Sequence, residues 1–198
     1  MSEIQVLKKP DNITFKQIQE VIKASHEENI KKGIVMKAAA LSAQEMEERV
    51  GKEGTCFVAM DDDKVVGTLS CREKEIHYWY HDGKTLKVLL AGILPAYQGR
   101  GIMSMFLKAA EDEAKKYGID TLFLDTAEEN INMRKLCMKK GFRHVDFRAF
   151  HSNHYSVILM KWMKGCPMSE KYCAFRFRIK RIYTIFRYKK GGGKRFYI

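Results

Sequence analysis

The residues best suited to chemistry lie where an apolar run turns through Pro95 into Gln98-Gly99-Arg100-Gly101 and then into a helical pattern. The first N–H groups of a helix lack intrahelical partners, and the helix dipole adds partial positive charge at that end. Gly99 and Gly101 let an anion approach the backbone without a Cβ clash, and Arg100 can add a forked donor. This spacing predicts a phosphate site, and the alternative is a tight turn with a solvated arginine.

Two common nucleotide motifs do not fit this segment. The dinucleotide fingerprint needs a third glycine, and the phosphate loop needs a lysine followed by serine or threonine. The residues after Gly101 are Ile-Met-Ser-Met, so both nucleotide motifs lose support.

A second strand-to-helix unit follows in residues 121–142. Thr121-Leu-Phe-Leu-Asp125 predicts a buried strand, and a short helix is expected from about Asn130 to a glycine stop at Gly141. Asn130 and Cys137 are seven residues apart, about two helical turns, so they are expected to face the same way. The loops of the two units could then open toward one crevice.

The two segments together resemble a known family. Residues 95–102, Pro-Ala-Tyr-Gln-Gly-Arg-Gly-Ile, resemble the acyl-CoA signature (Gln/Arg)-x-x-Gly-x-(Gly/Ala) of the GNAT superfamily of N-acyltransferases. The helix that begins at Asn130 and ends in Gly141-Phe142 is similar to that superfamily's segment Asn-x-x-Ala-x-x-x-Tyr-x-x-x-Gly-Phe. The resemblance covers residues 50–162 well and 1–50 in general layout only. It implies an α/β fold in which helices flank a mixed central β-sheet.

The resemblance also implies residue roles around acetyl-CoA, the acyl-donor cosubstrate. Asn130 would hydrogen-bond the pantetheine arm, and no metal is expected. The backbone positions that would bind the pyrophosphate are Gln98, Gly99, Arg100, Gly101, Ile102 and Met103, and those that would pair with the pantetheine arm as an added strand are Ala91, Gly92 and Ile93.

Two positions depart from the family pattern. Met103 stands where glycine or alanine is usual, which predicts an altered fit of the cofactor at the first helical turn. Cys137 stands where the family often has a tyrosine general acid. A thiol, with an ordinary pKa of about 8.5, can donate a proton to the leaving sulfur near neutral pH. The alternative is that Cys137 packs the helix against the sheet, as free cysteines commonly do.

The general base has several candidates. Glu73, Glu75 and His77 alternate along a predicted strand and so share one face, and Glu75 is taken as the candidate catalytic base. Asp125, at the end of a strand beside the expected crevice, is a carboxylate of similar weight. The alternative for Glu75 and its neighbours is the solvated side of an edge strand.

Composition indicates one α/β domain of residues 1–165 with an extension of residues 166–198. The chain has 198 residues, and its five cysteines are odd in number and lack Cys-x-x-Cys spacing, so neither a disulfide framework nor a zinc site is suggested. The first residues contain no hydrophobic signal region, and no apolar run approaches membrane-spanning length. A cytoplasmic protein is therefore expected.

The order of predicted elements favours a mixed sheet with helices on both faces. Ser42 and Glu45 form a capping box, and three aspartates at 61–63 read as a hairpin turn rather than a metal site. Strands are expected near residues 3–7, 57–60, 64–72, 84–93, 143–150 and 155–161, with helices from about 14 to 33 and from 42 to 51.

The extension carries most of the net charge. Residues 171–198 contain ten lysines or arginines and no acidic residue, which accounts for +10 of the net charge of +12. Apolar residues recur there at helical spacing: Tyr172, Phe175, Ile179, Ile182, Tyr183 and Phe186. Three alternatives follow for this face: it docks on the protein's own sheet or on a second subunit, it lies peripherally on an anionic membrane, or it binds nucleic acid or another polyanion.

Two classes of function follow. The first is an acyl-CoA-dependent N-acetyltransferase that transfers an acetyl group to a primary amine by direct attack in a ternary complex. The second is a non-catalytic acyl-CoA-binding module whose basic extension binds a membrane surface or polyanion. The amine acceptor is expected to be selected by the loops around residues 23–45 and 73–84.

Overall fold

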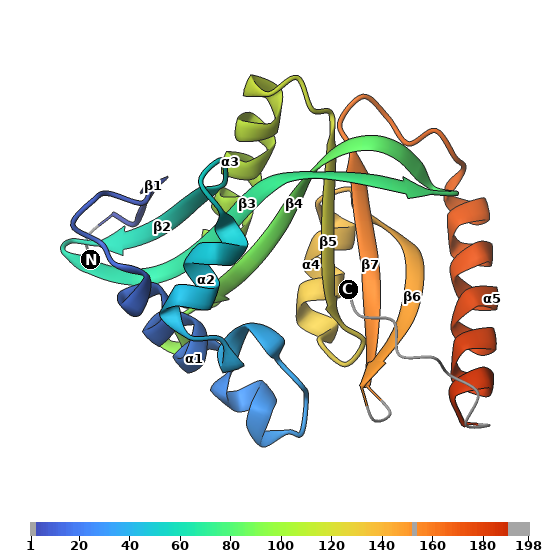
Figure 1. The fold of residues 1–198 in the computed structure, drawn as a ribbon, viewed down its shortest axis with the longest axis horizontal. Coiled ribbons are helices and arrows are strands. Elements are labelled where there is room, and N and C mark those ends of the chain that lie inside the picture. The colour runs from blue at the N-terminus through green and yellow to red at the C-terminus, as the bar shows by residue number, and fades with distance from the viewer. Residues whose placement is uncertain (1–2, 152–153, 190–198) are drawn as a thin grey trace.

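The computed structural model describes residues 3–151 and 154–189, which form a seven-stranded sheet with helices on both sides (Figure 1). The strand order is β1-β2-β3-β4-β5-β7-β6, and within the described chain β4 and β5 are the parallel neighbours while the other pairs are antiparallel. The strands are β1 (Gln5–Lys8), β2 (Thr55–Asp61), β3 (Lys64–Tyr78), β4 (His81–Ile93), β5 (Thr121–Ala127), β6 (Arg143–His151) and β7 (His154–Trp162). The predicted mixed α/β sheet is confirmed.

The helices begin and end at residues with local signals. Thr14 caps α1 and Ser42 caps α2, each in a capping box, and Gly33, Gly51 and Gly141 follow helix ends with positive φ. The Ser42 box is confirmed. The helices are α1 (Phe15–Lys31), α2 (Ala43–Val50), α3 (Ile102–Lys116), α4 (Ile131–Lys139) and α5 (Glu170–Lys189), with 3-10 turns η1 (Lys37–Ala40) and η2 (Pro95–Tyr97).

The sheet separates two main apolar cores. On one side Ile18, Ile22 and Met46 of α1 and α2 are fully buried. On the other side Phe106 of α3 and Phe142, which follows α4, belong to a larger core. Each helix therefore buries its apolar stripe against one face of the sheet, which fixes where its ends lie.

A buried carboxylate anchors α3 to the first two strands. Glu113 is 1% exposed and accepts hydrogen bonds from Lys8 Nζ (2.6 Å) and Thr55 Oγ1 (2.8 Å). Burial alone would raise the pKa of Glu113, but the hydrogen bonds from Lys8, Thr55 and Lys116 outweigh it and lower the pKa to about 2. This charged cluster holds the helix whose N-terminus forms part of the site.

The two halves of the sheet diverge between β4 and β5. These strands pair only through Leu86 with Leu122 and Lys87 with Phe123, and beyond that point β4 has an unpaired edge. The β3–β4 register also shifts between Thr68 and Ser70, and Leu90 has a φ of 50°, which marks a bulge in β4. The strand ends on either side of this divergence are available to line a cavity.

The β3–β4 hairpin is longer than the sequence predicts. Strand β3 continues to Tyr78 and β4 begins at His81. Polar residues cover its outer side, but Ile76 and Tyr80 are buried in a third core with Phe123. The hairpin tip reaches α5, where Trp79 meets Tyr172 edge-on with ring centroids 6.1 Å apart (Figure 1).

Helix α5 packs along β6, but through residues other than those the sequence analysis singled out. Cys173 and Phe177 are buried, and the Phe177 ring contacts His144 and Phe147 at centroid distances of 4.8 and 5.9 Å. The stripe for which docking was one of three alternatives is exposed on the opposite side of the helix, so it does not dock on the protein's own sheet. The apolar spacing of residues 172–186 thus predicts the helix, but the residues that pack on β6 are not the ones that this spacing singles out. No helix in residues 3–151 and 154–189 has the length and apolar character needed to cross a bilayer.

Candidate active site

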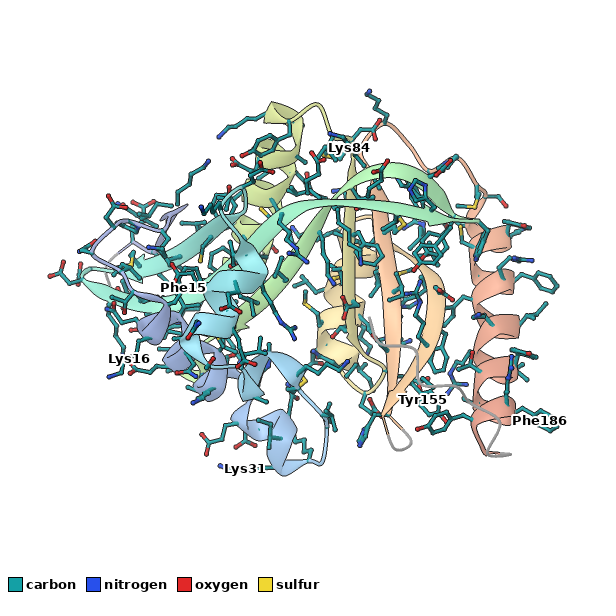
Figure 2. All side chains as sticks on the ribbon, in the orientation of Figure 1. Phe15, Lys16, Lys31, Lys84, Tyr155 and Phe186 are labelled. Atoms are coloured by element: carbon teal, nitrogen blue, oxygen red, sulfur yellow. The ribbon has the colours of Figure 1, made fainter. Side chains whose placement is uncertain are left out.

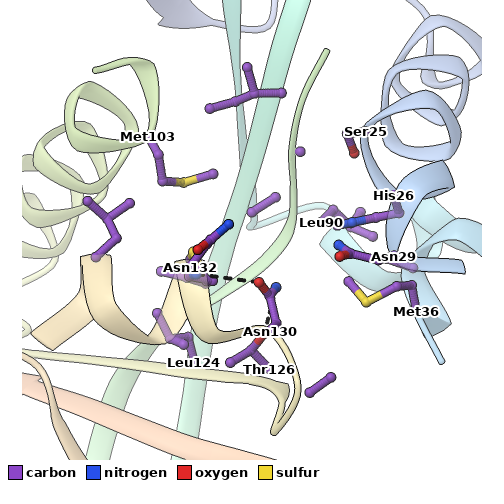
Figure 3. Close-up of a pocket in the computed structure, with 18 of the residues that line it drawn as sticks. Ser25, His26, Asn29, Met36, Leu90, Met103, Leu124, Thr126, Asn130 and Asn132 are labelled. Atoms are coloured by element: carbon purple, nitrogen blue, oxygen red, sulfur yellow. Dashed lines mark hydrogen bonds between the residues drawn. The ribbon is translucent and has the colours of Figure 1, made fainter. Parts of the chain in front are cut away.

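A cavity of about 810 Å³ lies where β4 and β5 diverge (Figure 3). One wall comes from α1 and η1, another from α4 and the loop before it, and the floor from β4 and β5. The segment from η2 to the start of α3 closes one end. Most of the cofactor-binding residues expected from the sequence therefore line one space, although 130 and 91 are 39 positions apart in the chain.

The N-terminus of α3 supplies an array of backbone donors. Gly101 is the N-cap, and no side chain caps this helix. Within the described residues, the N–H groups of 99–103 donate to no backbone carbonyl. Gly99 and Gly101 have positive φ, and a Cβ at either would meet nothing within 4 Å, so the approach to these donors is open. Free N–H groups at the positive end of a helix form a site for a phosphate group.

Side chains brace this loop rather than point into the cavity. The Gln98 Nε2 atom donates to the Ile93 carbonyl (3.1 Å), and the Tyr97 hydroxyl donates to Asp61 (2.7 Å). The Arg100 guanidinium lies 4.8 Å from the centroid of the Tyr97 ring and is not among the cavity-lining residues. Its backbone lies in the donor array, but its side chain is exposed beside the cavity.

The β4 wall includes Ala91, Gly92 and Ile93, as expected, and α1 packs closely behind it. A Cβ at Gly92 would lie 2.3 Å from Ser25 Oγ, so only glycine allows this approach. His26 is 9% exposed, and its Nδ1 atom has no hydrogen-bond partner. Burial lowers the pKa of His26, against a backbone hydrogen bond with Ala91 that raises it. The histidine is thus kept neutral against the β4 bulge.

Asn130 lies across the cavity from α1 and caps α4 (Figure 3). Its Oδ1 atom accepts from the Met133 N–H (3.4 Å), and its Nδ2 atom donates to Thr126 Oγ1 (3.2 Å). Met103 projects into the cavity from α3 and narrows the space beside the donor array. The structure therefore brings Asn130 and Met103 to the cavity that the segment from η2 to the start of α3 closes.

Cys137 does not share this position, and the expectation that it faces the same way as Asn130 is corrected. Its side chain is 0% exposed and belongs to the core between α4 and the sheet, outside the cavity lining. Burial raises its pKa to about 12. Asn130 is the cap rather than a residue within the helix, so the seven-residue spacing does not place the two side chains on one face. The geometry favours the packing role.

Of the two carboxylates considered for the general base, Glu75 lies outside the cavity and Asp125 lines it. Glu75 lies on the outer side of the β3–β4 hairpin, its side chain 62% exposed, and it does not line the cavity. Asp125 does line it and lies 3.2 Å from Lys87 Nζ across the divergence of β5 and β4. Both of these charged side chains are at the point where the strands part.

Sequence reasoning missed Ser25, His26 and Lys87 as components of this cavity. All three lie within regular elements, and nothing in the local pattern separates them from ordinary helix or strand residues. The adjacent Ser25 and His26 on an amphipathic helix are too common a pattern to indicate a cavity.

Comparison with known proteins agrees with the described fold. The model of the acetyltransferase (GNAT) family matches residues 19–142, which is more than half of the chain. The chain belongs to the GNAT acetyltransferase family. No curated protein matches its sequence.

Solved structures of GNAT proteins share the fold at low sequence identity. An acetyltransferase of the GNAT family from Streptococcus agalactiae superposes with a TM-score of 0.65 at 15% identity, covering 80% of this chain and 95% of that one. The ribosomal-protein-S18-alanine N-acetyltransferase from Escherichia coli gives 0.61 at 14%, covering 84% and 96%. A GNAT family acetyltransferase from Elizabethkingia anophelis with acetyl-CoA bound gives 0.58 at 15%, covering 82% and 99%.

Proposed function

We propose that this protein transfers the acetyl group of acetyl-CoA to a primary amine by direct attack in a ternary complex. The observation that carries the proposal is the cavity itself, which joins an open donor array at the start of α3 to the unpaired edge of β4. An array of this kind binds phosphate groups, and a strand edge binds an extended amide chain. Acetyl-CoA has both chemical features.

In the proposed complex the parts of acetyl-CoA lie in order along the donor side of the cavity. The N–H groups of residues 99–103 bind the pyrophosphate, and the pantetheine arm pairs with β4 at Ala91–Ile93. Asn130, which fixes the start of α4, retains acceptor capacity on its amide oxygen for the arm. Met103 limits the width of the path between these two contacts.

The acceptor side supplies a carboxylate at the point where β4 and β5 part. Asp125 binds the incoming ammonium group and takes its proton, and the salt bridge to Lys87 exchanges for one to the amine. The neutral amine then forms a bond to the acetyl carbonyl carbon, and the carbon–sulfur bond breaks to release CoA as a thiolate, which is protonated from solvent. A backbone N–H of the β4 bulge polarises the carbonyl oxygen.

His26 acts as a positioning residue in this scheme. Its ring is held between α1 and the Ala91 backbone, so it fixes the shape of the bulge without touching the amine. Burial keeps it neutral, and a neutral ring avoids placing a second cation next to the incoming ammonium group.

The donor site is tested by titrating acetyl-CoA calorimetrically into the wild type, Gly101→Asp and Gly101→Asn. Aspartate and asparagine both tolerate positive φ, so the pair differs mainly in charge. We expect Gly101→Asp to weaken binding by at least about tenfold more than Gly101→Asn, because a carboxylate at the N-cap repels the pyrophosphate and competes for its donors.

Gly118→Asp is the matched control, because Gly118 also has positive φ and open space but lies at the other end of α3. It should bind acetyl-CoA like the wild type. Release of CoA is then measured with a panel of amines. Equal loss in the two aspartate variants would contradict the donor site, and tight binding with no turnover on any amine would indicate the non-catalytic acyl-CoA-binding module.

A further inference from the structure

Helix α5 has two apolar stripes on opposite sides. The inner stripe contains the buried Cys173 and Phe177 and packs on β6. The outer stripe consists of side chains that are 46–67% exposed: Tyr172, Phe175, Ile179, Ile182 and Tyr183. At about 100° per residue the two stripes lie about 180° apart. A helix that only covered the sheet would need the inner stripe alone.

Two rows of basic residues border the outer stripe. Lys171 and Arg178 lie along one border, and Arg176, Lys180 and Arg187 lie along the other. All five side chains are exposed. The acidic residue within α5 is Glu170 in the first turn, and it pairs with Arg143 of β6. The outward surface of the helix therefore consists of an apolar centre with positive margins.

The outer stripe continues onto the neighbouring β3–β4 hairpin. Trp79 at its tip is 42% exposed and contacts Tyr172, and the Arg176 guanidinium lies 4.6 Å from the centroid of the Trp79 ring. In Figure 2 side chains on the outer side of α5 project away from the sheet, and Phe186 is among them. Contiguous apolar patches of this kind mark interaction surfaces.

We propose that the outer face of α5, with Trp79, binds the surface of an anionic lipid bilayer. The apolar stripe would enter the boundary between headgroups and acyl chains, and the two basic rows would contact lipid phosphates on either side. Tryptophan and tyrosine favour this boundary because their rings are apolar with one polar group. The helix lies along the surface and does not cross it.

The charges favour lipid over the other occupants. A second copy of this face would set the basic rows of one helix against those of the other, with no acidic residue on the outer face to pair with them. A nucleic acid would engage the basic rows through its phosphates but would leave the central apolar stripe against a charged backbone. A bilayer offers anionic phosphates at the margins and hydrocarbon at the centre.

This docking would leave the cavity accessible. Helix α5 lies at the β6 edge of the sheet, whereas α1 and η1, which form one wall of the cavity, lie at the other end (Figure 1). The proposal is independent of the acetyltransferase assignment, because it rests on residues outside the cavity.

The test is flotation of the full chain with vesicles of phosphatidylcholine alone or with about one-third phosphatidylglycerol. The test variant combines Phe175→Ser, Ile179→Ser and Ile182→Ser. The control combines Ile30→Ser, Tyr117→Ser and Ile131→Ser, which are 49%, 53% and 54% exposed on or beside α1, α3 and α4. Thermal melting confirms that both variants fold.

Wild type and control are expected to float with the anionic vesicles and not with phosphatidylcholine alone, and added salt should weaken binding. The test variant should lose at least about tenfold in partition coefficient. Three results would overturn the proposal: no flotation of the wild type, equal flotation of test and control variants, or a dimer in sedimentation that only the test variant disrupts while vesicles stay unbound.

Discussion

At the scale of single residues, the site is defined by which polar side chains reach the cavity. Asp125 and Lys87 meet at the floor where β4 and β5 separate, while Glu75 on the outer side of the hairpin stays in solvent. In the proposed reaction this carboxylate exchanges its salt bridge to Lys87 for one to the incoming ammonium group. The residue that acts on the amine is therefore expected to be Asp125.

Asp125→Asn should lower kcat/KM for amine acetylation by about 10²-fold or more, because it removes the carboxylate that binds and deprotonates the acceptor. Binding of acetyl-CoA, measured by calorimetry, should remain close to wild type. Glu75→Gln is the matched control and should change the rate little. A full loss of rate in Glu75→Gln, with Asp125→Asn unaffected, would contradict this prediction and support Glu75 as the general base.

His26 makes a second residue-scale test possible. His26→Ala should raise KM for acetyl-CoA, because the ring that packs on the Ala91 backbone is lost, and His26→Gln should restore part of it through a side-chain amide. Steady-state kinetics of the two variants provide the measurement. A merely structural residue would lower stability in both variants without a selective recovery of KM by glutamine.

At the scale of elements, the two ends of α4 lie in different surroundings, although the sequence analysis expected Asn130 and Cys137 to face the same way. Its cap, Asn130, lies in the cavity wall, and Cys137 in its last turns fills the core against the sheet. The thiol of Cys137 is thereby separated from the cavity. In the reaction that we propose, the leaving thiolate therefore receives its proton from solvent.

Cys137→Ser should lower the free energy of unfolding by about 1–3 kcal/mol, because it places a hydroxyl in an apolar core. It should leave kcat/KM within about twofold of wild type, whereas loss of a general acid costs far more. Urea unfolding and initial-rate measurements on the same preparation separate these effects. A loss of kcat with unchanged stability would support a catalytic thiol instead.

At the scale of the whole molecule, a titratable side chain lies where α5 packs on β6. His144 lies under Phe177 and near Arg134 Nε, which is 3.5 Å from its Nε2 atom. Burial, together with the charge of Arg134, lowers the pKa of His144 to about 4 from an ordinary value of 6.5. His144 therefore binds a proton at a higher pH in the unfolded chain than in the folded chain.

The contribution of neutral His144 to the free energy of unfolding should be fully present above pH 6.5 and should be lost as the pH falls from about 6.5 toward 4. His144→Phe keeps a ring against Phe177 and removes the titration, so the variant should lose less stability over this window, by at most about 3 kcal/mol. Urea unfolding at several pH values gives the comparison. A difference between the two proteins that does not change with pH would contradict the assignment.

Local chemistry in the sequence accounts for much of the cofactor side. The glycines at 99 and 101, the Asn130 cap and the Gly141 stop act through the backbone of a few neighbouring residues, so their spacing predicts two strand-to-helix units and, together with the family resemblance, an anion site. The β3–β4 hairpin extends beyond the predicted strands at 64–72 and 84–93 because Ile76 and Tyr80 near its tip are buried with Phe123, a contact that forms only in the tertiary structure.

The polar residues on the α1 and β5 sides of the cavity, and the packing of α5, were decided only by tertiary structure. Ser25, His26 and Asp125 reach the cavity because α1 packs behind β4 and because β5 diverges from it, and neither event is written in local spacing. Helix α5 carries apolar residues on two opposite sides. Shape and ring contacts with His144 and Phe147 selected the stripe containing Phe177, and this choice left the more aromatic stripe facing outward.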